Sequence, residues 1–311
     1  MLGRVSEELV RIGTPRQREG GRPVRPEGRP EWLRIRLSTP ARYHEVRRLV
    51  AKLSLHTVCE EARCPNIYEC WGEHGTATFM ILGDVCTRRC GFCAVTSGRP
   101  QPGVDADEPA HVAEAVAAMG LRHAVVTTVD RDDLPDGGAG HFAAVIAAIH
   151  GVPGCAVEVL TPDFRGVPEA LDVVLGAGPE VFSHNVETVE RLYREARPGS
   201  RYRRSLDLLA DAAARRDRGE YAGRVKTGIM VGIGETPGEV HELLGHIRDC
   251  GVEILTIGQY LQPTSGHLPV DRWVTPEEFA EHRALALELG FAHCEAGPLV
   301  RSSYHAHEHV G

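Results

Sequence analysis

The stretch TATFMILGDVCTRRCGFCAV, from Thr76 to Val95, contains the two features that decide the fold. Its first seven residues form a short apolar run, which predicts a β-strand. Three cysteines, Cys86, Cys90 and Cys93, follow within eight residues on what reads as a loop. The sequence therefore predicts a strand whose carboxyl end carries three thiols.

Beyond this loop, short β-rich runs alternate with helical patterns almost to the end of the chain. The runs expected to be strands are 76–82, 123–129, 155–160, 180–186, 225–231, 253–259 and 291–296. The segments expected to be helices after the first strand are 109–120, 141–151, 167–178 and 205–217. Two further helices are expected to begin at Thr236 and Thr275, because each threonine is followed by Pro and then by Glu three residues on. That pattern is typical of a helix N-terminus with a capping box.

Strands that alternate with helices predict a parallel sheet with right-handed crossovers. Six or seven such units indicate an α/β fold, a partial (β/α)6-type TIM barrel preceded by an N-terminal extension that contains a helix from Thr39. The chemistry of such a barrel lies at the carboxyl ends of its strands. The cysteine loop falls at one of these ends.

The charge of the chain is unevenly distributed. The net charge of all 311 residues is −8, although residues 1–58 contain thirteen Lys/Arg against six Glu. Residues 13–31 are rich in Gly, Pro and Arg and predict a flexible arm. A basic arm on an acidic body could contact nucleic acid or an acidic protein. We disfavour nucleic acid because no Lys/Arg run has interleaved aromatic residues.

Neither a membrane span nor a secretion signal is visible. No stretch approaches the eighteen or so consecutive apolar residues of a transmembrane helix, and the N-terminus lacks an apolar signal core. We therefore expect a cytoplasmic protein, and disulfides are rare in that compartment. The nine cysteines, six of them between positions 59 and 93, then indicate metal binding.

The cysteines of the loop have the spacing CxxxCxxC, whereas structural zinc sites often use two CxxC pairs. Three thiolates from one short loop can bind three irons of a cubane and leave the fourth iron open. A zinc site with a distant fourth ligand is the alternative. With Phe92 before the last cysteine, the pattern resembles that of the radical S-adenosylmethionine enzymes. The resemblance implies that Cys86, Cys90 and Cys93 hold a 4Fe–4S cluster, that its open iron binds S-adenosylmethionine, and that Phe92 lies near the adenine.

A second set of cysteines precedes the first predicted strand. The segment CEEARCPNIYEC places Cys59, Cys64 and Cys70 at the spacing CxxxxCxxxxxC. Taken alone, it is compatible with zinc or with iron–sulfur. Three thiols again need a fourth ligand or leave one position open.

Together the two sets resemble those of the lipoyl synthases. Other segments match that family in order: RPEWLRIRLSTP, TTVDRDDLPDGGAGHF, SHNVETVERLY, RPGSRYRRSLDLL, KTGIMVGIGET, GQYLQPT and RSSYHA. The resemblance implies that Cys59, Cys64 and Cys70 hold an auxiliary 4Fe–4S cluster, with Ser303 of RSSY as the fourth ligand. From the residues alone, Ser303 would be an ordinary loop hydroxyl. The implied regions are a flexible basic arm (1–38), an extension with the auxiliary ligands (39–75), the radical S-adenosylmethionine barrel (76–297) and a C-terminal extension with the serine (298–311).

The resemblance also implies a reaction. Two sulfur atoms are inserted at carbons six and eight of an octanoyl group in amide linkage to a lysine. Two S-adenosylmethionine molecules are consumed, and the auxiliary cluster donates the sulfide. Alkane carbon is too weakly acidic for a side-chain base, so cofactors must carry the chemistry.

Three kinds of partner are implied as well. The substrates would be octanoylated carrier domains, including the glycine-cleavage H-protein and the acyltransferase subunits of 2-oxoacid dehydrogenases. A reductant protein such as ferredoxin or flavodoxin would supply electrons, and an iron–sulfur carrier would repair the auxiliary cluster. The basic N-terminal arm is expected to dock the carrier.

Residues at other predicted strand ends are candidates for contacts with S-adenosylmethionine, because ligands of a barrel bind at its rim. These candidates are Asp130, Asn185, Glu187, Arg197, Gly232 and Gly234. An arginine fork suits a carboxylate, and in the family the glycine-rich segment lies beside the nucleoside. Solvated surface is the alternative for the polar residues, and close strand packing explains the glycines equally well.

Three rival functions remain open at this point. A biotin synthase would not combine the upstream cysteine set with a terminal RSSY. A methylthiotransferase would usually carry its auxiliary cysteines in a separate N-terminal domain. A non-enzymatic zinc-binding adaptor is the rival from a different class.

The remaining cysteines and the terminal histidines have plain explanations. Cys155, Cys250 and Cys294 lie in or beside apolar elements and are expected to serve in packing. The histidines at positions 305, 307 and 309 could bind a metal, but a frayed tail is the simpler expectation.

Overall fold

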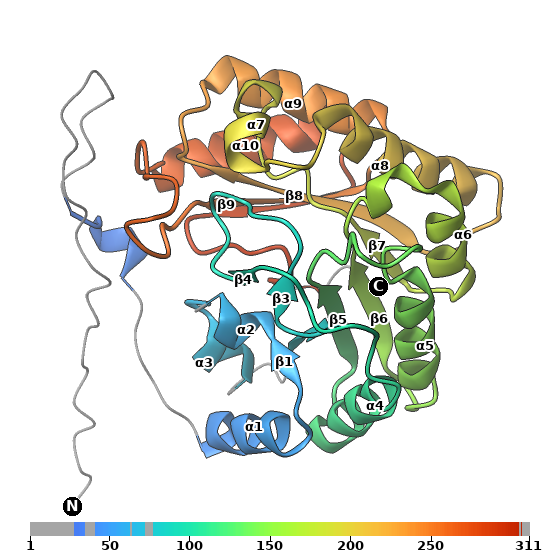
Figure 1. Ribbon diagram of the computed structural model, residues 1–311. Coiled ribbons are helices and arrows are strands. Elements are labelled where there is room, and N and C mark those ends of the chain that lie inside the picture. Colours follow the sequence, from blue (N-terminus) through green and yellow to red (C-terminus); the bar gives the residue numbers. More distant parts are fainter. Residues whose placement is uncertain (1–27, 35–40, 63, 72–76, 305, 307–311) are drawn as a thin grey trace, which may run out of the picture.

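The fold is built on one twisted sheet with helices on its outer side (Figure 1). The computed structural model describes residues 28–34, 41–62, 64–71, 77–304 and 306. The spatial order of the sheet is β1 (His56–Thr57), β2 (Thr78–Ile81), β5 (His123–Thr128), β6 (Ala156–Leu160), β7 (Val181–Ser183), β8 (Arg224–Val231), β9 (Ile254–Gln259) and β10 (His293–Gly297). Only β1 pairs antiparallel, with β2, and the other neighbours are parallel.

The helices follow the strands as the sequence predicts. The α-helices are α1 (Ala41–Lys52), α2 (Val58–Glu61), α3 (Ile67–Glu69), α4 (Glu108–Met119), α5 (Ala139–His150), α6 (Pro168–Gly176), α7 (Tyr193–Ala196), α8 (Tyr202–Asp217), α9 (Pro237–Asp249) and α10 (Pro276–Glu288). Short 3₁₀ turns are η1 (Glu31–Leu33), η3 (Phe164–Gly166) and η4 (Glu190–Leu192). Six strands, β2 and β5 to β9, are each followed by a covering helix before β10 ends the sheet. The predicted partial (β/α)6 barrel is thereby confirmed, and within the described residues no pairing closes it.

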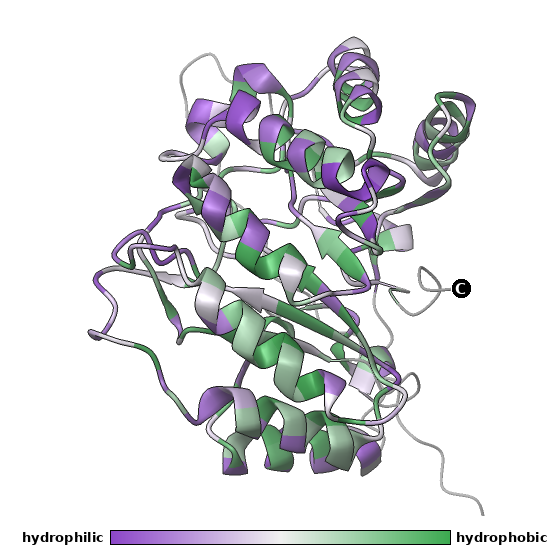
Figure 2. Ribbon diagram, turned by 90° about the vertical axis from the view of Figure 1, so that its right-hand side faces the viewer, coloured by the Kyte–Doolittle hydropathy of each residue, from purple (hydrophilic) through white to green (hydrophobic). Residues whose placement is uncertain are grey.

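The packing of the covering helices explains why these segments are helical. Helix α5 buries Phe142, Val145, Ile146 and Ile149, which recur on one face of a helix. Figure 2 shows apolar residues concentrated in the strands and along the sides of the helices that meet them. None of the helices in the described part of the chain combines the length and the apolarity that a membrane crossing requires.

Two helix starts have the predicted capping boxes. The side chain of Thr236 accepts a hydrogen bond from the Glu239 amide, and the Glu239 carboxylate accepts one from the Thr236 amide. Thr275 and Glu278 repeat this arrangement at α10. Each box satisfies amide groups that a helix N-terminus leaves without intrahelical partners.

A sharp turn after β2 starts the cysteine loop. Leu82 and Gly83 both have positive φ, of 68° and 91°, and the Leu82 amide donates to the buried carboxylate of Glu108 at 2.9 Å. The short strands β3 (Val85–Cys86) and β4 (Thr96–Ser97) pair in parallel and close the base of the loop. The three cysteines of the loop therefore lie at the carboxyl end of β2, as predicted.

The two extensions of the chain pack against each other beside this loop. The Asn66 side chain donates to the Leu299 carbonyl at 2.8 Å, and the Tyr304 hydroxyl donates to Glu69 at 3.3 Å. Residues 28–34 also contact the barrel, since the Trp273 indole donates to the carbonyl of Gly28 at 2.7 Å. The rest of the predicted arm lies outside the described residues, as do the histidines at positions 305, 307 and 309.

A charged pair is buried inside the barrel. The Lys226 ammonium on β8 lies 2.7 Å from the Glu158 carboxylate on β6, and both side chains are at most 1% exposed. His123 on β5 lies 3.6 Å from the same carboxylate. Burial raises the pKa of Glu158, but Lys226 and His123 together outweigh this effect and lower that pKa to about 2.

Candidate functional site

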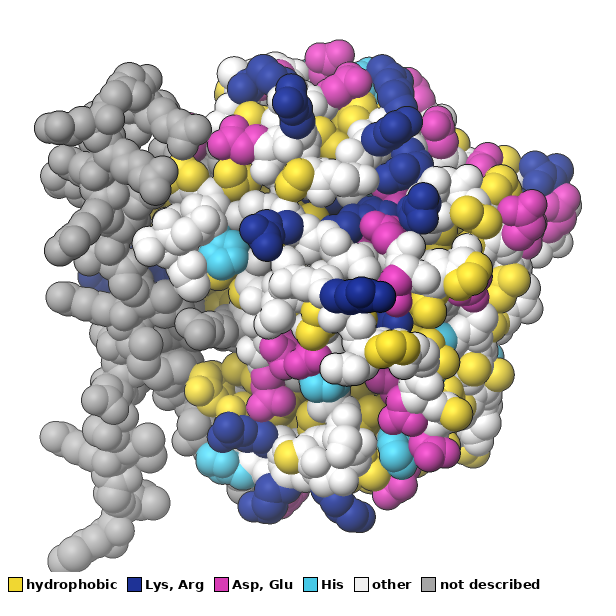
Figure 3. Space-filling model, viewed as in Figure 1, with side chains coloured by type: hydrophobic (Ala, Val, Ile, Leu, Met, Phe, Trp, Pro, Cys, Tyr) yellow, Lys and Arg dark blue, Asp and Glu magenta, His cyan; other side chains and the backbone are white. Residues whose placement is uncertain are grey.

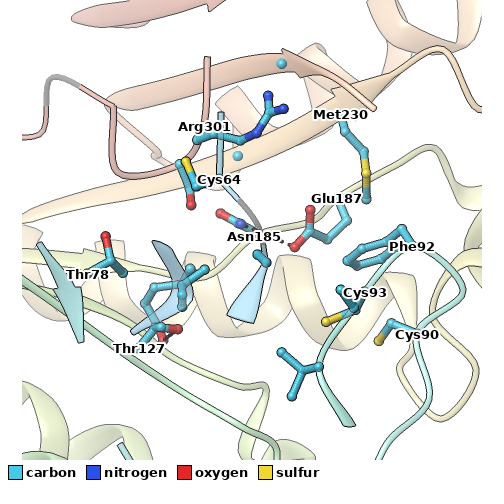
Figure 4. A pocket seen from close by; sticks show the side chains of 18 of the residues that line it. Cys64, Thr78, Cys90, Phe92, Cys93, Thr127, Asn185, Glu187, Met230 and Arg301 are labelled. Carbon is cyan, nitrogen blue, oxygen red and sulfur yellow. Dashed lines mark hydrogen bonds between the residues drawn. The ribbon is translucent and has the colours of Figure 1, made fainter. Parts of the chain in front are cut away.

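A cavity of about 420 Å³ opens at the carboxyl ends of the strands and receives residues from every region of the described chain (Figure 4). Both predicted cysteine sets contribute to its walls, and so does the C-terminal extension. The predicted site residues that line it are Cys59, Cys64, Cys86, Cys90, Phe92, Cys93, Asp130, Asn185, Glu187, Arg197 and Ser303. The fold thus brings together groups that lie more than 240 residues apart in the sequence.

The three thiols of the loop lie at one side of the cavity. Burial raises the pKa of Cys86 to about 11 and that of Cys90 to about 12. The Cys86 sulfur accepts hydrogen bonds from the backbone amides of Arg88 and Asp130, at 3.4 and 3.3 Å. Amide donors of this kind stabilise negative charge on sulfur and lower the pKa of Cys86, although burial and the Asp130 carboxylate outweigh them.

The second cysteine set converges on the same cavity from the N-terminal extension. Thr57 caps α2 by accepting from the Glu60 amide, and the Cys64 amide donates to the Cys59 carbonyl at 3.0 Å. Burial, and after it the neighbouring Cys64 thiol, raise the pKa of Cys59 to about 12. Burial also raises the pKa of Cys70, as do the nearby thiols of Cys64 and Cys59.

Ser303 reaches the cavity from the other end of the chain. Its hydroxyl accepts a hydrogen bond from Thr78 on β2 at 2.9 Å. The guanidinium of Arg301 also lines the cavity, and its charge lowers the pKa of Cys64, against the effect of burial. Five of the six thiols and one hydroxyl therefore line one cavity, whereas Cys70 is not part of its lining. Cysteine thiolates are the usual ligands of iron–sulfur clusters.

The candidates for contacts with S-adenosylmethionine gather around Arg197. Its guanidinium donates to the Asn185 carbonyl at 2.7 Å and to the Tyr193 hydroxyl at 2.9 Å. The Asn185 side chain donates to Glu187 at 3.2 Å (Figure 4). Among the described residues, Asn185 Oδ1 and Arg197 Nε are buried without a hydrogen-bond partner, whereas Asp130 Oδ1 lies 3.2 Å from the Arg88 guanidinium. Because buried polar atoms are normally satisfied, the atoms of Asn185 and Arg197 fit contacts with a polar ligand.

Burial and neighbouring charges oppose each other in this group. Burial raises the pKa of Glu187, whereas Arg197 lowers it. Burial raises the pKa of Asp130, and Arg88 and Arg197 act against that rise. Glu187 also has a positive φ of 72°, a conformation that a non-glycine residue rarely adopts and that is typical of functional sites.

Two predicted contacts lie apart from the described lining of the cavity. Gly232 and Gly234 have positive φ, of 94° and 116°, in the turn after β8. A Cβ atom at Gly232 would lie 2.2 Å from the Gln259 side chain, so close packing explains that glycine. A role for either glycine in binding S-adenosylmethionine stays a prediction.

His184, at the same strand end as Asn185, points away from the cavity. Its ring nitrogens lie 2.8 Å from the Thr161 carbonyl and 2.9 Å from the Ser205 hydroxyl. Burial lowers its pKa to about 4. Of the remaining cysteines, Cys155 and Cys294 are buried in the core and Cys250 packs against it.

Sequence reasoning missed two arginines. Arg88 is buried beside the cysteine loop and pairs with three carboxylates, and Arg301 lines the cavity next to Cys64. Arg88 has the same chemistry as its exposed neighbour Arg89. No local pattern could have separated them, because a loop lacks the periodicity that distinguishes buried from exposed positions.

Comparison with family models gives first the class of protein. Residues 80–247 match the Radical SAM superfamily, which covers the barrel from β2 to α9. Residues 16–64 match the N-terminal domain of lipoyl synthase of the Radical SAM family. The fold and the site therefore belong to a radical S-adenosylmethionine protein.

Curated relatives then give the particular family. A lipoyl synthase of Rubrobacter xylanophilus is 56% identical over 98% of this chain and 91% of its own length. One of Roseiflexus is 56% identical over 91% of this chain and 92% of its own. One of Methylococcus capsulatus is 54% identical over 97% and 91%. The chain belongs to the lipoyl synthase family.

Solved structures support the fold. Methylornithine synthase superposes with a TM-score of 0.51 over 83% of each chain, at 12% sequence identity. The hydrogenase maturase HydG superposes with a TM-score of 0.53 over 85% of this chain and 74% of its own, at 13% identity. At such low sequence identities, both similarities concern the fold alone.

Proposed function

We propose that this cavity divides the work of lipoyl synthesis between its two cysteine groups. The family membership makes the chain a radical S-adenosylmethionine enzyme that inserts two sulfur atoms, at carbons six and eight of a protein-bound octanoyl-lysine. It uses S-adenosylmethionine and two 4Fe–4S clusters. When bound, these groups supply hydrogen-atom abstraction and sulfide. The observation that carries the division of work is that the three loop cysteines, Cys59 and Cys64 of the second group, and Ser303 line one cavity.

The family's motifs, together with the shared cavity, support a proposed set of ligands for each cluster. Cys86, Cys90 and Cys93 would hold the radical cluster, with one iron left for S-adenosylmethionine. The auxiliary cluster would be held by Cys59, Cys64, Cys70 and Ser303. An alkoxide is a harder and less usual ligand for iron than a thiolate, so Ser303 would be the ligand released most easily as the cluster loses sulfur.

The other walls of the cavity provide the binding functions. Phe92, Asp130, Asn185, Glu187 and Arg197 would orient S-adenosylmethionine, and the unpartnered atoms noted above support that role. Apolar side chains also line the cavity and would bind the octanoyl chain away from water. They include Val58, Met80, Val129, Leu160 and Ile229.

The four regions expected from the sequence are part of this proposal, each with its own role. They are the basic arm (1–38), the extension with the auxiliary ligands (39–75), the barrel (76–297) and the C-terminal extension (298–311). The contacts of Asn66 with Leu299 and of Tyr304 with Glu69 support the view that the two extensions complete one ligand set.

The enzyme acts on lipoyl carrier proteins, and we propose that the basic N-terminal region docks them. Figure 3 shows basic and acidic side chains interspersed over one face of the molecule, so the positive charge of residues 1–58 is the more distinctive docking feature. Charge reversal between Arg16 and Arg36 should weaken binding of the carrier at low salt, and unchanged affinity would refute this docking. The H-protein and the acyltransferase subunits as carriers, ferredoxin or flavodoxin as reductant, an iron–sulfur carrier and a cytoplasmic location belong to the same proposal.

An anaerobic assay with an octanoylated carrier peptide and S-adenosylmethionine tests the division of work. Cys64→Ala should leave formation of 5′-deoxyadenosine largely intact and abolish sulfur transfer, because it affects only the auxiliary group. Cys90→Ala should stop both. Cys155→Ala is the control, since Cys155 belongs to the core and not to the cavity. Loss of both products in Cys64→Ala, with the radical cluster intact by spectroscopy, would contradict the proposal.

A further inference from the structure

The loop between Cys86 and Cys90 contains two adjacent arginines in opposite environments. The Arg88 side chain is only 3% exposed, whereas Arg89 is exposed to solvent. A buried arginine is rare without a compensating role, because its charge must be paired. The proposed radical mechanism assigns no function to it.

The guanidinium of Arg88 has a complete set of acceptors. Its Nε and Nη2 donate to the two oxygens of Asp132, at 2.8 and 2.7 Å. Its Nη2 also donates to Asp163 at 2.7 Å, and its Nη1 donates to the Ser200 hydroxyl at 3.0 Å. The Asp130 carboxylate lies 3.2 Å from Nη1. These acceptors follow β5 and β6 or precede α8, so one side chain ties the cysteine loop to three segments of the barrel rim.

This network fixes the surroundings of one sulfur. The Cys86 sulfur accepts from the amides of Arg88 and Asp130, at 3.4 and 3.3 Å. Thr87 links the cysteine loop to the segment after β5, since its amide and its hydroxyl both donate to the Asp130 carbonyl, at 2.9 and 2.8 Å. One amide donor to Cys86 is therefore the amide of Arg88 itself. The other belongs to Asp130, whose carboxylate contacts the Arg88 guanidinium.

Hydrogen bonds to a ligating sulfur are one determinant of the reduction potential of an iron–sulfur cluster. The amide dipoles stabilise the reduced state, which carries the more negative charge, and so they raise the potential. We propose that Arg88 is a positioning residue of the radical cluster, which fixes two amide donors at Cys86 and thereby sets the potential at which the cluster delivers its electron. The inference rests on the proposed role of Cys86, Cys90 and Cys93 as ligands.

Redox titration followed by electron paramagnetic resonance tests the inference. The parent is the full chain with Cys59, Cys64 and Cys70 replaced by Ala, so that one cluster gives the signal. Arg88→Met should make the midpoint potential more negative than in the parent. Arg89→Met, the matched control, should leave it unchanged, since Arg89 is exposed.

Two further variants separate position from charge. Arg88→Lys keeps the charge but loses the planar fork that contacts several acceptors, so it should restore only part of the potential. Ser200→Ala removes a neutral acceptor and should give a small shift in the same direction. If Arg88→Lys has the midpoint potential of the parent and Ser200→Ala shows no shift, Arg88 acts only through its charge. That result would overturn the inference.

Hydrogen exchange in the metal-free full-length chain gives a readout that needs no cluster. The Asp130 amide should exchange faster in Arg88→Met and Arg88→Lys than in the wild type or Arg89→Met. An equal potential in the parent and in Arg88→Met, or equal exchange at Asp130, contradicts the inference alone. A parent without any four-iron cluster contradicts the ligand assignment, and the inference with it.

Discussion

At the scale of single residues, Ser303 is the oxygen donor of the proposed auxiliary site. Its hydroxyl is held by Thr78, and Thr78 lies on β2, immediately before the cysteine loop. The serine is thus positioned by the barrel itself. The proposed serine ligand, which binds iron more weakly than a thiolate, would then have a fixed position beside the cysteine ligands. Such a position suits a cluster that must lose sulfur during turnover.

The role of Ser303 as ligand leads to a first prediction. Ser303→Ala should lower the iron content from about eight per chain and reduce sulfur transfer by about tenfold or more, while 5′-deoxyadenosine still forms. Ser303→Cys should restore the iron content, because a thiolate is a stronger ligand. Ser302→Ala is the matched control, since its neighbouring hydroxyl also lines the cavity. Equal iron content in Ser303→Ala and Ser302→Ala would exclude Ser303 as a ligand.

Single residues also show which parts of the site can be predicted from the sequence and which cannot. The ligand assignments come from the spacing of the cysteines and from the family's motifs, and the structure brings all of the assigned ligands except Cys70 to the wall of one cavity. Arg88 could not be predicted, because its burial depends on carboxylates from two distant loops. For Gly232 the sequence leaves ligand binding and close packing open, and the nearby Gln259 side chain, which a single sequence does not reveal, accounts for the glycine by packing.

At the scale of elements, the buried pair of Lys226 and Glu158 links β8 to β6 across the interior of the barrel. Glu158→Gln should destabilise the metal-free protein by about 3–5 kcal/mol, because Lys226 loses its carboxylate partner. Chemical denaturation at neutral pH measures this loss. Glu169→Gln, in the first turn of α6, is the surface control and should change stability by less than about 0.5 kcal/mol.

The same pair predicts a pH dependence. The pKa of Glu158 is about 2 in the folded protein and 4.5 as the ordinary value, so the pair stabilises the fold above pH 4.5, and this contribution is lost as the pH falls toward 2. The wild type should lose roughly 3 kcal/mol more than Glu158→Gln over this interval. If the free energy of unfolding falls equally with pH in the two metal-free proteins, the Glu158 carboxylate is not paired in the fold.

Elements differ in how well the sequence predicts them. All seven parallel strands of the large sheet are predicted, because each is an apolar run bounded by turn residues. Both capping boxes are visible as threonine, proline and glutamate at fixed offsets. The strands β1, β3 and β4 have two residues each. They are missed because so short a segment has no periodicity and forms only through its tertiary partner.

At the scale of the whole molecule, the N-terminal and C-terminal extensions meet beside the barrel. The contacts of Asn66 with Leu299 and of Tyr304 with Glu69 join the extensions. Removal of residues 298–311 should therefore lower the iron content to about four per chain and abolish sulfur transfer, whereas formation of 5′-deoxyadenosine should continue. A truncated protein that retains about eight irons would show that the auxiliary site is complete without the C-terminal extension.

The central claim is that one cavity holds two clusters with unequal roles, one for hydrogen abstraction and one as the source of sulfur. Isotopic labelling tests it most directly. The protein is reconstituted anaerobically with ³⁴S-sulfide, separated from free sulfide, and given octanoylated carrier peptide and S-adenosylmethionine for a single turnover. We predict a lipoyl product in which both sulfur atoms carry the label. An unlabelled product from fully labelled protein would contradict the account.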